Sequence, residues 1–242
     1  MTNRLDQLGY WLSTAICAAL VVLFIPVLIK SFLYDAWGMI YAYKWEWWKD
    51  GCFIGIIAGF ALYGLFMLVL KIPRMQHNLD WFMKFTHELT HTLVAVLFFA
   101  KIHEFVVKDR ECYVSYKAGP IGYVPITLAP YCIPIYTFML LPFRFFGDSH
   151  YMIVFDILIA FTYAFHIHSF VMQTSSDQPD IEGCGLARSA AFISFVHMSV
   201  LSLILATPKG GVANALVRVF WEYPQQFLFQ PEKWMAEVTK FL

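Results

Sequence analysis

Long apolar segments are the feature that most restricts how this chain can fold. A helix needs about 20 consecutive apolar residues to cross the hydrocarbon core of a bilayer, and six segments meet or nearly meet that length. They are residues 10–33, 52–70, 81–100, 127–145, 151–171 and 186–206. The sequence therefore predicts an all-α integral membrane protein with about six transmembrane helices, lying in a lipid bilayer.

The composition supports a membrane protein and argues against some functions. Of the 242 residues, 60% are hydrophobic and only 14% are charged. The hydrophobic fraction is higher, and the charged fraction lower, than in a typical soluble domain. Lysine plus arginine equals aspartate plus glutamate at 17 each, so no basic surplus indicates a nucleic-acid partner. A phosphate-binding loop and a dinucleotide fingerprint are both missing.

The segments between the apolar stretches predict smaller elements. Residues 101–117 alternate aromatic and β-branched residues around a charged turn at 108–111, which predicts a β-hairpin between the third and fourth helices, followed by an extended piece rich in proline and glycine. The Trp- and Tyr-rich residues 34–51 are typical of the headgroup level. The tail after residue 210 is expected to form short amphipathic helices.

We expect a single membrane domain with three parts. Residues 1–79 hold two spans and the interfacial loop, residues 80–185 hold the chemistry described next, and residues 186–242 hold the last span and the amphipathic tail.

The third apolar segment contains a short motif that predicts a metal site. In "HELTH" the residues His87 and His91 are four apart, so on a helix both imidazoles lie on one face and can hold one cation. Glu88 in such a motif takes a proton from the attacking water and passes it to the leaving amine. Charged residues inside a spanning helix cost at least ~2.5 kcal/mol each on insertion scales. We therefore prefer a zinc site over a chance match in which the histidines only bond neighbouring helices.

Three stretches within residues 80–185 resemble the site-2 protease family of intramembrane zinc metallopeptidases, and most closely its small bacterial members. They are "HELTHTLVAVLFFAKIHEFVV", "LAPYCIPIY" and "FDILIAFTYAFHIHSFVMQTSSDQPDI". The resemblance implies a motif-bearing helix, a hairpin that dips into the membrane, a further helix, and then a helix with an aspartate as the third zinc ligand.

The same resemblance implies a location and a substrate class. The location is the bacterial inner membrane, in a multi-pass protein. The substrate class is a membrane-spanning protein or peptide, such as an anti-sigma factor, a membrane-bound transcription regulator or a leftover signal peptide.

Two departures from the family pattern leave part of the site open. Thr90 stands where family members usually have glycine, and no Asn/Pro-containing segment ends in Asp-Gly. The third ligand and the group that stabilises the oxyanion must therefore be sought elsewhere.

Two aspartates compete as the third metal ligand. If the fourth segment spans fully, Asp156 lies within a few ångströms of the depth of His87 and His91, because a helix rises ~1.5 Å per residue. Asp180 would then lie roughly 30 Å away, near the opposite face. We therefore prefer Asp156, with Asp180 as the runner-up because "QPDI" resembles a segment of the small relatives. The alternative for Asp156 is a buried acid paired with a basic or hydroxyl partner.

Other polar side chains are candidates for supporting roles. His166 and His168 are two residues apart and point to different faces of a helix, so either could be an oxyanion donor or a partner of a metal ligand, or could simply be packed. Packing is also the simplest reading of four more residues, His197, Tyr131, Tyr136 and Tyr163, of which the three tyrosines could donate to an oxyanion. The stretch "KAGPIGYVPITLAP", residues 117–130, could let an unwound substrate add as a β-strand, or could be a plain connecting loop.

The sequence thus predicts a zinc-dependent endopeptidase of the membrane. His87, His91 and Asp156 are expected to hold Zn²⁺, with Glu88 as the general base and then the general acid for a zinc-activated water. The alternatives are a membrane metal transporter and a metal-binding membrane protein without enzymatic activity.

Overall fold

The computed structural model describes residues 4–37, 51–69, 73–108, 111–119, 121–146, 152–207 and 211–241. Within these residues the chain is mostly helical, with one small two-stranded sheet. Most of the predicted interfacial loop, residues 38–50, lies outside the described residues.

Three helices in the described part of the chain are long and apolar enough to cross a membrane, over Gln7–Asp35, Met152–Gln173 and Leu186–Ala206. The first comprises α1 (Arg4–Lys30) and part of the π-helical η1 (Ser31–Trp37), and the others are α8 (Met152–Gln173) and α10 (Leu186–Ala206). The apolar part of α3 (Gly51–Val69) is shorter, and α4 (Pro73–Leu97) carries too many polar residues to qualify. The expectation of six spans is therefore not supported.

The fourth predicted span is not one helix. Residues 127–145 are divided among α5 (Tyr123–Cys132), α6 (Ile135–Leu140) and α7 (Phe143–Phe146). Ile133 has an extended backbone and Pro134 precedes α6, because a proline forces the residue before it out of the helical region and lacks an N–H for the helix ladder. The prediction of a full span here is wrong.

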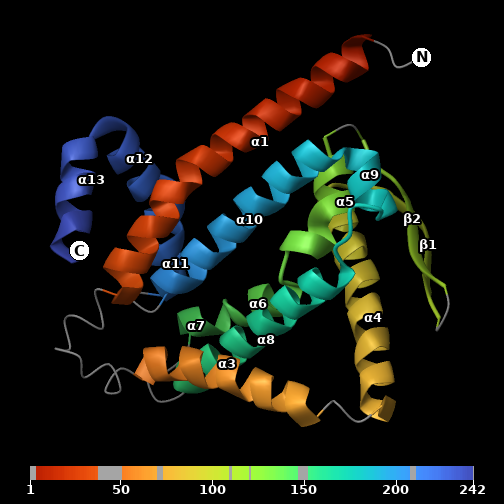
Figure 1. Cartoon of the computed structure of the whole chain (residues 1–242), viewed down its shortest axis with the longest axis horizontal. Helices are drawn as coiled ribbons and strands as arrows, with labels where there is room; N and C mark the ends of the chain where they lie inside the picture. Colours follow the sequence, from red (N-terminus) through yellow and green to blue (C-terminus); the bar gives the residue numbers. More distant parts are fainter. Residues whose placement is uncertain are drawn as a thin grey trace.

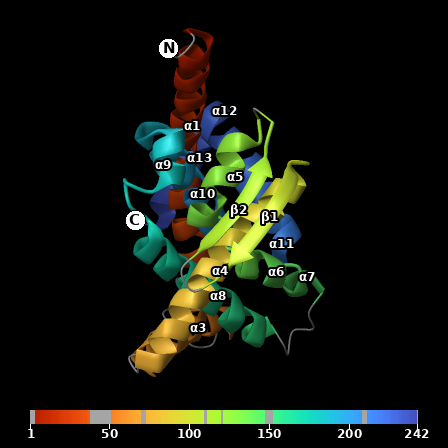
Figure 2. The same cartoon turned by 90° about the vertical axis from the view of Figure 1, so that its right-hand side faces the viewer.

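The predicted hairpin is confirmed. Strand β1 (Lys101–Val107) pairs antiparallel with β2 (Cys112–Lys117), with Phe105 opposite Val114 and an irregularity between Ile102 and Glu104. Figure 2 shows the hairpin lying over α4 and α5. The extended piece expected after it is short, because α5 already begins at Tyr123 and accommodates a proline in its first turn.

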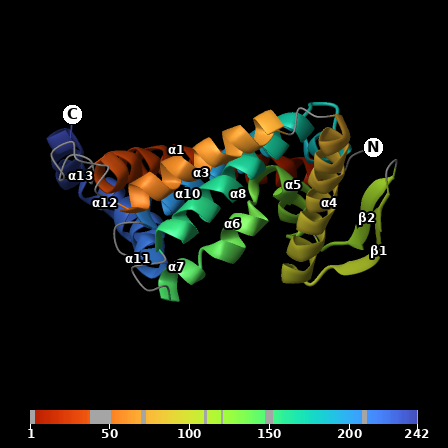
Figure 3. The same ribbon diagram turned by 90° about the horizontal axis from the view of Figure 1, so that it is seen from below.

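Two pairs of helices form the body of the molecule (Figure 1). Helix α1 lies beside α10, where Phe24, Val27, Val200 and Leu203 are buried together. Helix α3 lies beside α8. Helix α4 crosses the α3/α8 pair steeply in Figures 1 and 3.

The tail forms short helices, as the sequence predicts. They are α11 (Gly211–Val217), η5 (Arg218–Glu222), α12 (Tyr223–Phe229), α13 (Pro231–Val238) and η6 (Thr239–Phe241). They are fixed to the end of the first span by a hydrogen bond of 2.7 Å from Tyr223 to Asp35 and by an ion pair of 2.6 Å between Lys30 and Glu237.

Two glycines allow α3 and α8 to approach closely. A Cβ atom on Gly59 would lie 2.3 Å from the Ile157 carbonyl oxygen and 2.7 Å from the Ala160 Cβ, and one on Gly55 would lie 2.9 Å from the Ile153 carbonyl oxygen. This Gly-xxx-Gly spacing is a common way for helices in membranes to pack backbone against backbone. The two glycines therefore hold α8 directly against α3.

We predict that Gly59→Leu lowers the thermal unfolding temperature of the detergent-purified protein. The new side chain would collide with the backbone of α8, and overpacking of this kind costs about 1–3 kcal/mol or more. Gly64→Leu is the matched control on the same helix, because nothing lies within 4 Å of a Cβ atom there. Equal unfolding temperatures for the two variants would contradict the close packing.

Candidate metal centre

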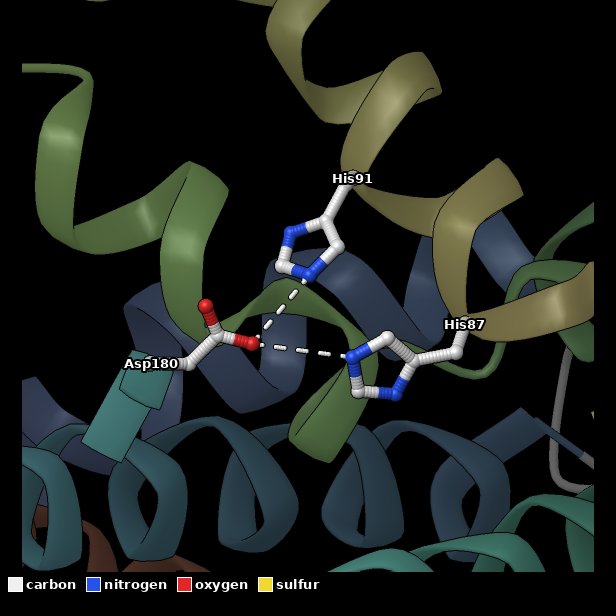
Figure 4. Close-up of side chains that lie close together, drawn as sticks. All are labelled: His87, His91 and Asp180. Carbon is white, nitrogen blue, oxygen red and sulfur yellow. Dashed lines mark ion pairs between the residues drawn. The ribbon is translucent and has the colours of Figure 1, made fainter. Parts of the chain in front are cut away.

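Three side chains converge where α4 meets α9 (Pro179–Cys184), as Figure 4 shows. His87 Nε2 lies 3.6 Å from Asp180 Oδ2, and His91 Nε2 lies 3.3 Å from the same oxygen. One potential ligand atom from each residue lies within 4.8 Å of the other two. Atoms bound to one tetrahedral zinc at ~2.0–2.1 Å lie about 3.3 Å apart, so the two nitrogen–oxygen separations are close to those of a zinc site.

The third residue of this group is Asp180, the runner-up, and not Asp156. Asp156 lies near the start of α8 and accepts a hydrogen bond of 2.7 Å from Arg144 Nε of α7, with both side chains buried. The prediction that Asp156 lies beside the histidines is wrong, and the alternative reading as a buried acid with a basic partner is confirmed. The depth argument failed because residues 127–145 do not cross as one helix and because His87 lies at the other end of α8, beside Gln173.

The chain after α8 turns back to bring Asp180 to the histidines. Gln178 has an extended backbone and Pro179 occupies the first turn of α9, a position where its missing N–H costs nothing. The next residue but one, Ile181, is buried with Leu128 and Tyr131 of α5. Gly185 then leads into α10 with a φ of 84°, a backbone that favours glycine.

Neighbouring oxygens fix which nitrogen of each imidazole faces the group. His91 Nδ1 lies 2.8 Å from the Ile126 carbonyl oxygen, and because a carbonyl can only accept, Nδ1 is the donor. His87 Nδ1 lies 3.3 Å from Gln173 Oε1, which also accepts from Ser169 at 3.0 Å. Both Nε2 atoms then face Asp180, with lone pairs when the imidazoles are neutral and with N–H donors when they are protonated. Outer partners orient metal-binding histidines in the same way.

A positive charge between His87, His91 and Asp180 would stabilise their arrangement. Burial raises the pKa of the Asp180 carboxyl, and the hydrogen bonds and charges of His87 and His91 lower it by more, so the pKa is below its ordinary value. The carboxylate is therefore ionised at neutral pH. Three atoms with lone pairs facing one another repel unless a proton or a cation lies between them, and two imidazoles with one carboxylate are a ligand set that suits zinc.

Glu88 lies next to this group without joining it. Its side chain is 8% exposed and lines an open cleft of about 370 Å³ together with His87, Lys84 and Gln173. The cleft gives water a polar route to the two motif residues. This is the placement expected of a general base beside a metal centre.

The other candidate residues divide between the site and the core. Tyr131 donates a hydrogen bond of 3.2 Å to Asp180 Oδ2. His166 is buried and lines a narrow pocket that also contains His87. His168 instead bonds Tyr63 of α3 at 2.7 Å.

The remaining three candidates do not join the ligand group. Tyr136 bonds Thr86 at 3.1 Å, Tyr163 lies in the α1/α10 core, and His197 Nε2 donates to the Tyr131 carbonyl oxygen at 2.9 Å.

Comparison of the chain with protein-family models, with curated proteins and with solved structures gave no match. The functional argument therefore rests on the chemistry of the site itself.

We predict that Asp180→Ala loses bound zinc and that Asp156→Asn keeps it. The first variant removes one of three converging ligands, whereas the second preserves a hydrogen-bond acceptor for Arg144 far from the histidines. Zinc is measured by mass spectrometry on detergent-purified protein, with about one ion per chain expected in the wild type and none in the double variant His87→Ala/His91→Ala. Zinc retained in Asp180→Ala would contradict the proposed ligand set.

Proposed function

We propose that this protein is a zinc-dependent endopeptidase of the membrane that hydrolyses a peptide bond of a membrane-embedded substrate. The observation that carries the proposal is the convergence of His87, His91 and Asp180 beside Glu88 at a polar cleft. A set of two histidines and one carboxylate leaves a fourth position open for catalysis, as in the soluble enzymes that share the motif.

The residues of the chain have distinct roles in this reaction. His87, His91 and Asp180 would hold the zinc ion. A zinc ion held in this way would lower the pKa of a water molecule at the site and polarise the substrate carbonyl. Glu88 accepts the proton of the attacking water and then donates it to the leaving amine. Gln173 and the Ile126 carbonyl keep the two imidazoles oriented throughout.

The location of the group supports cleavage near one surface of the bilayer. His87 contacts Gln173, the last residue of α8 and the end of a candidate span. The substrate bond would then be hydrolysed close to water, in a protein that crosses the membrane several times. The resemblance to the small bacterial proteases favours the bacterial inner membrane.

An apolar groove supports a membrane-spanning protein or peptide as substrate. The groove has a volume of about 430 Å³ and is lined by α3, α4, α6 and α8, with Phe66 and Phe82 among its residues. It shares Tyr136, Thr162 and Phe165 with the narrow pocket that reaches His87. Apolar segments could therefore approach the site from the lipid side while water approaches through the polar cleft.

A metal transporter receives less support from the arrangement. A transport path needs successive binding stations, and among the described residues a grouping of three potential ligand residues occurs at one place, around His87, His91 and Asp180.

We predict that Glu88→Gln keeps zinc and loses at least 10²-fold of the cleavage rate, because general acid–base groups typically contribute 10²–10⁴-fold. The assay follows quenched-fluorescent apolar peptides of varied sequence in vesicles that contain the purified protein, with products identified by mass spectrometry. Glu111→Gln, an exposed acid of the hairpin turn, is the matched control and should cleave normally. Wild-type cleavage by Glu88→Gln would contradict the proposed role.

A further inference from the structure

Tyr131 is placed at the edge of the candidate metal group. Its side chain is 1% exposed, and its hydroxyl donates to Asp180 Oδ2 at 3.2 Å. That oxygen is the atom that faces Nε2 of both histidines. The Tyr131 ring also meets the His87 ring edge to face, with centroids 5.2 Å apart. The hydroxyl is thus adjacent to the space that the three ligand atoms surround.

The surroundings of Tyr131 hold it in this place. Its ring is packed with Leu128, Ile181 and Cys184, which are themselves buried. Its carbonyl oxygen accepts a hydrogen bond of 2.9 Å from His197 Nε2. With the ring held in this way, only the hydroxyl hydrogen has to turn for Tyr131 to donate to developing charge at the group.

Three of the other candidates, Tyr136, His168 and Tyr163, bond or pack elsewhere. Tyr136 bonds Thr86, and His168 bonds Tyr63. Tyr163 lies in the α1/α10 core. Of the three candidate tyrosines, Tyr131 is the one whose hydroxyl contacts a residue of the metal group.

Glu88 and Tyr131 also reach the group from different surroundings. Glu88 lines the polar cleft with Lys84 and Gln173, whereas Tyr131 lies among the buried residues between α5 and α9. Glu88 is therefore placed to take a proton from water that enters through the cleft. Tyr131 is placed to donate to the carbonyl oxygen from the buried side.

We propose that Tyr131 donates the hydrogen bond that stabilises the oxyanion formed on the attacked carbonyl, an assignment that rests on the proposed endopeptidase function. Water adds to the carbonyl carbon, the C=O π electrons move to oxygen, and Glu88 takes the proton of the water. The C–N bond then breaks as the electrons return and Glu88 gives the proton to the amine. Tyr131 keeps its own proton throughout and moves its hydrogen bond from Asp180 to the oxyanion.

The test compares two probes with the same peptide part on the cobalt-substituted protein. One is a capped leucyl-leucine phosphinic dipeptide, whose tetrahedral anion imitates the oxyanion, and the other carries a thiol that binds the metal through sulfur. Binding is followed by the visible absorption of cobalt, which needs no substrate. In Tyr131→Phe we expect the phosphinic probe to bind about 10–100-fold more weakly, the loss of one hydrogen bond to a charged group. Thiol binding and cobalt content should stay unchanged.

Tyr113→Phe is the matched control, because it removes a hydroxyl that also donates to a carboxylate, Glu104 of the exposed hairpin at 3.0 Å, and not to a residue of the metal group. It should bind both probes as the wild type does. Equal phosphinic affinity in Tyr131→Phe and wild type would overturn the assignment. Lost cobalt, or equal weakening of both probes, would also overturn it, because Tyr131 would then only position Asp180. A wild type that takes up no cobalt would overturn the endopeptidase proposal as well, whereas the first two results leave that proposal standing.

Discussion

The convergence of three lone-pair atoms between α4 and α9 is the constraint on which the rest of the structure depends. Oδ2 of Asp180 lies 3.6 Å from Nε2 of His87 and 3.3 Å from Nε2 of His91, an arrangement that a shared positive charge stabilises. The imidazoles are oriented from outside, by the Ile126 carbonyl and by Gln173. The elements that carry these groups therefore have to be held at fixed positions.

The fold provides those positions through breaks as well as through helices. Pro130, inside α5, has no N–H to donate to the Ile126 carbonyl four residues earlier, and this carbonyl instead accepts from His91 of the motif helix. Tyr131 of the same helix donates to Asp180. The close glycine packing of α3 on α8 holds the helix whose last residue, Gln173, touches His87. The short turn after α8 then returns Asp180 to the group.

Features set by neighbouring residues could be predicted from the sequence, and features set by distant contacts could not. The pairing of His87 with His91 follows from helical spacing alone, and the hairpin follows from alternation around a charged turn. The choice between Asp156 and Asp180 depended on whether one segment crosses fully and on the angle at which α4 meets α8. Pro125, Pro130 and Pro134 indicate an interrupted helix between residues 127 and 145. The apolar composition of the same residues favours a continuous span, and the prediction followed the composition. Arg144, the partner of Asp156, is 12 residues away in the sequence and belongs to another helix. Residue spacing within a helix therefore could not predict their ion pair.

The most direct test of the account is X-ray absorption spectroscopy at the zinc edge on the purified wild-type protein. The account predicts a first shell of nitrogen and oxygen atoms at ~2.0–2.2 Å, with the outer-shell scattering of two imidazole rings and no sulfur. A sulfur shell near 2.3 Å would contradict it, since it would place a cysteine such as Cys112 of the polar cleft on the metal. Scattering from fewer than two imidazoles would contradict it equally.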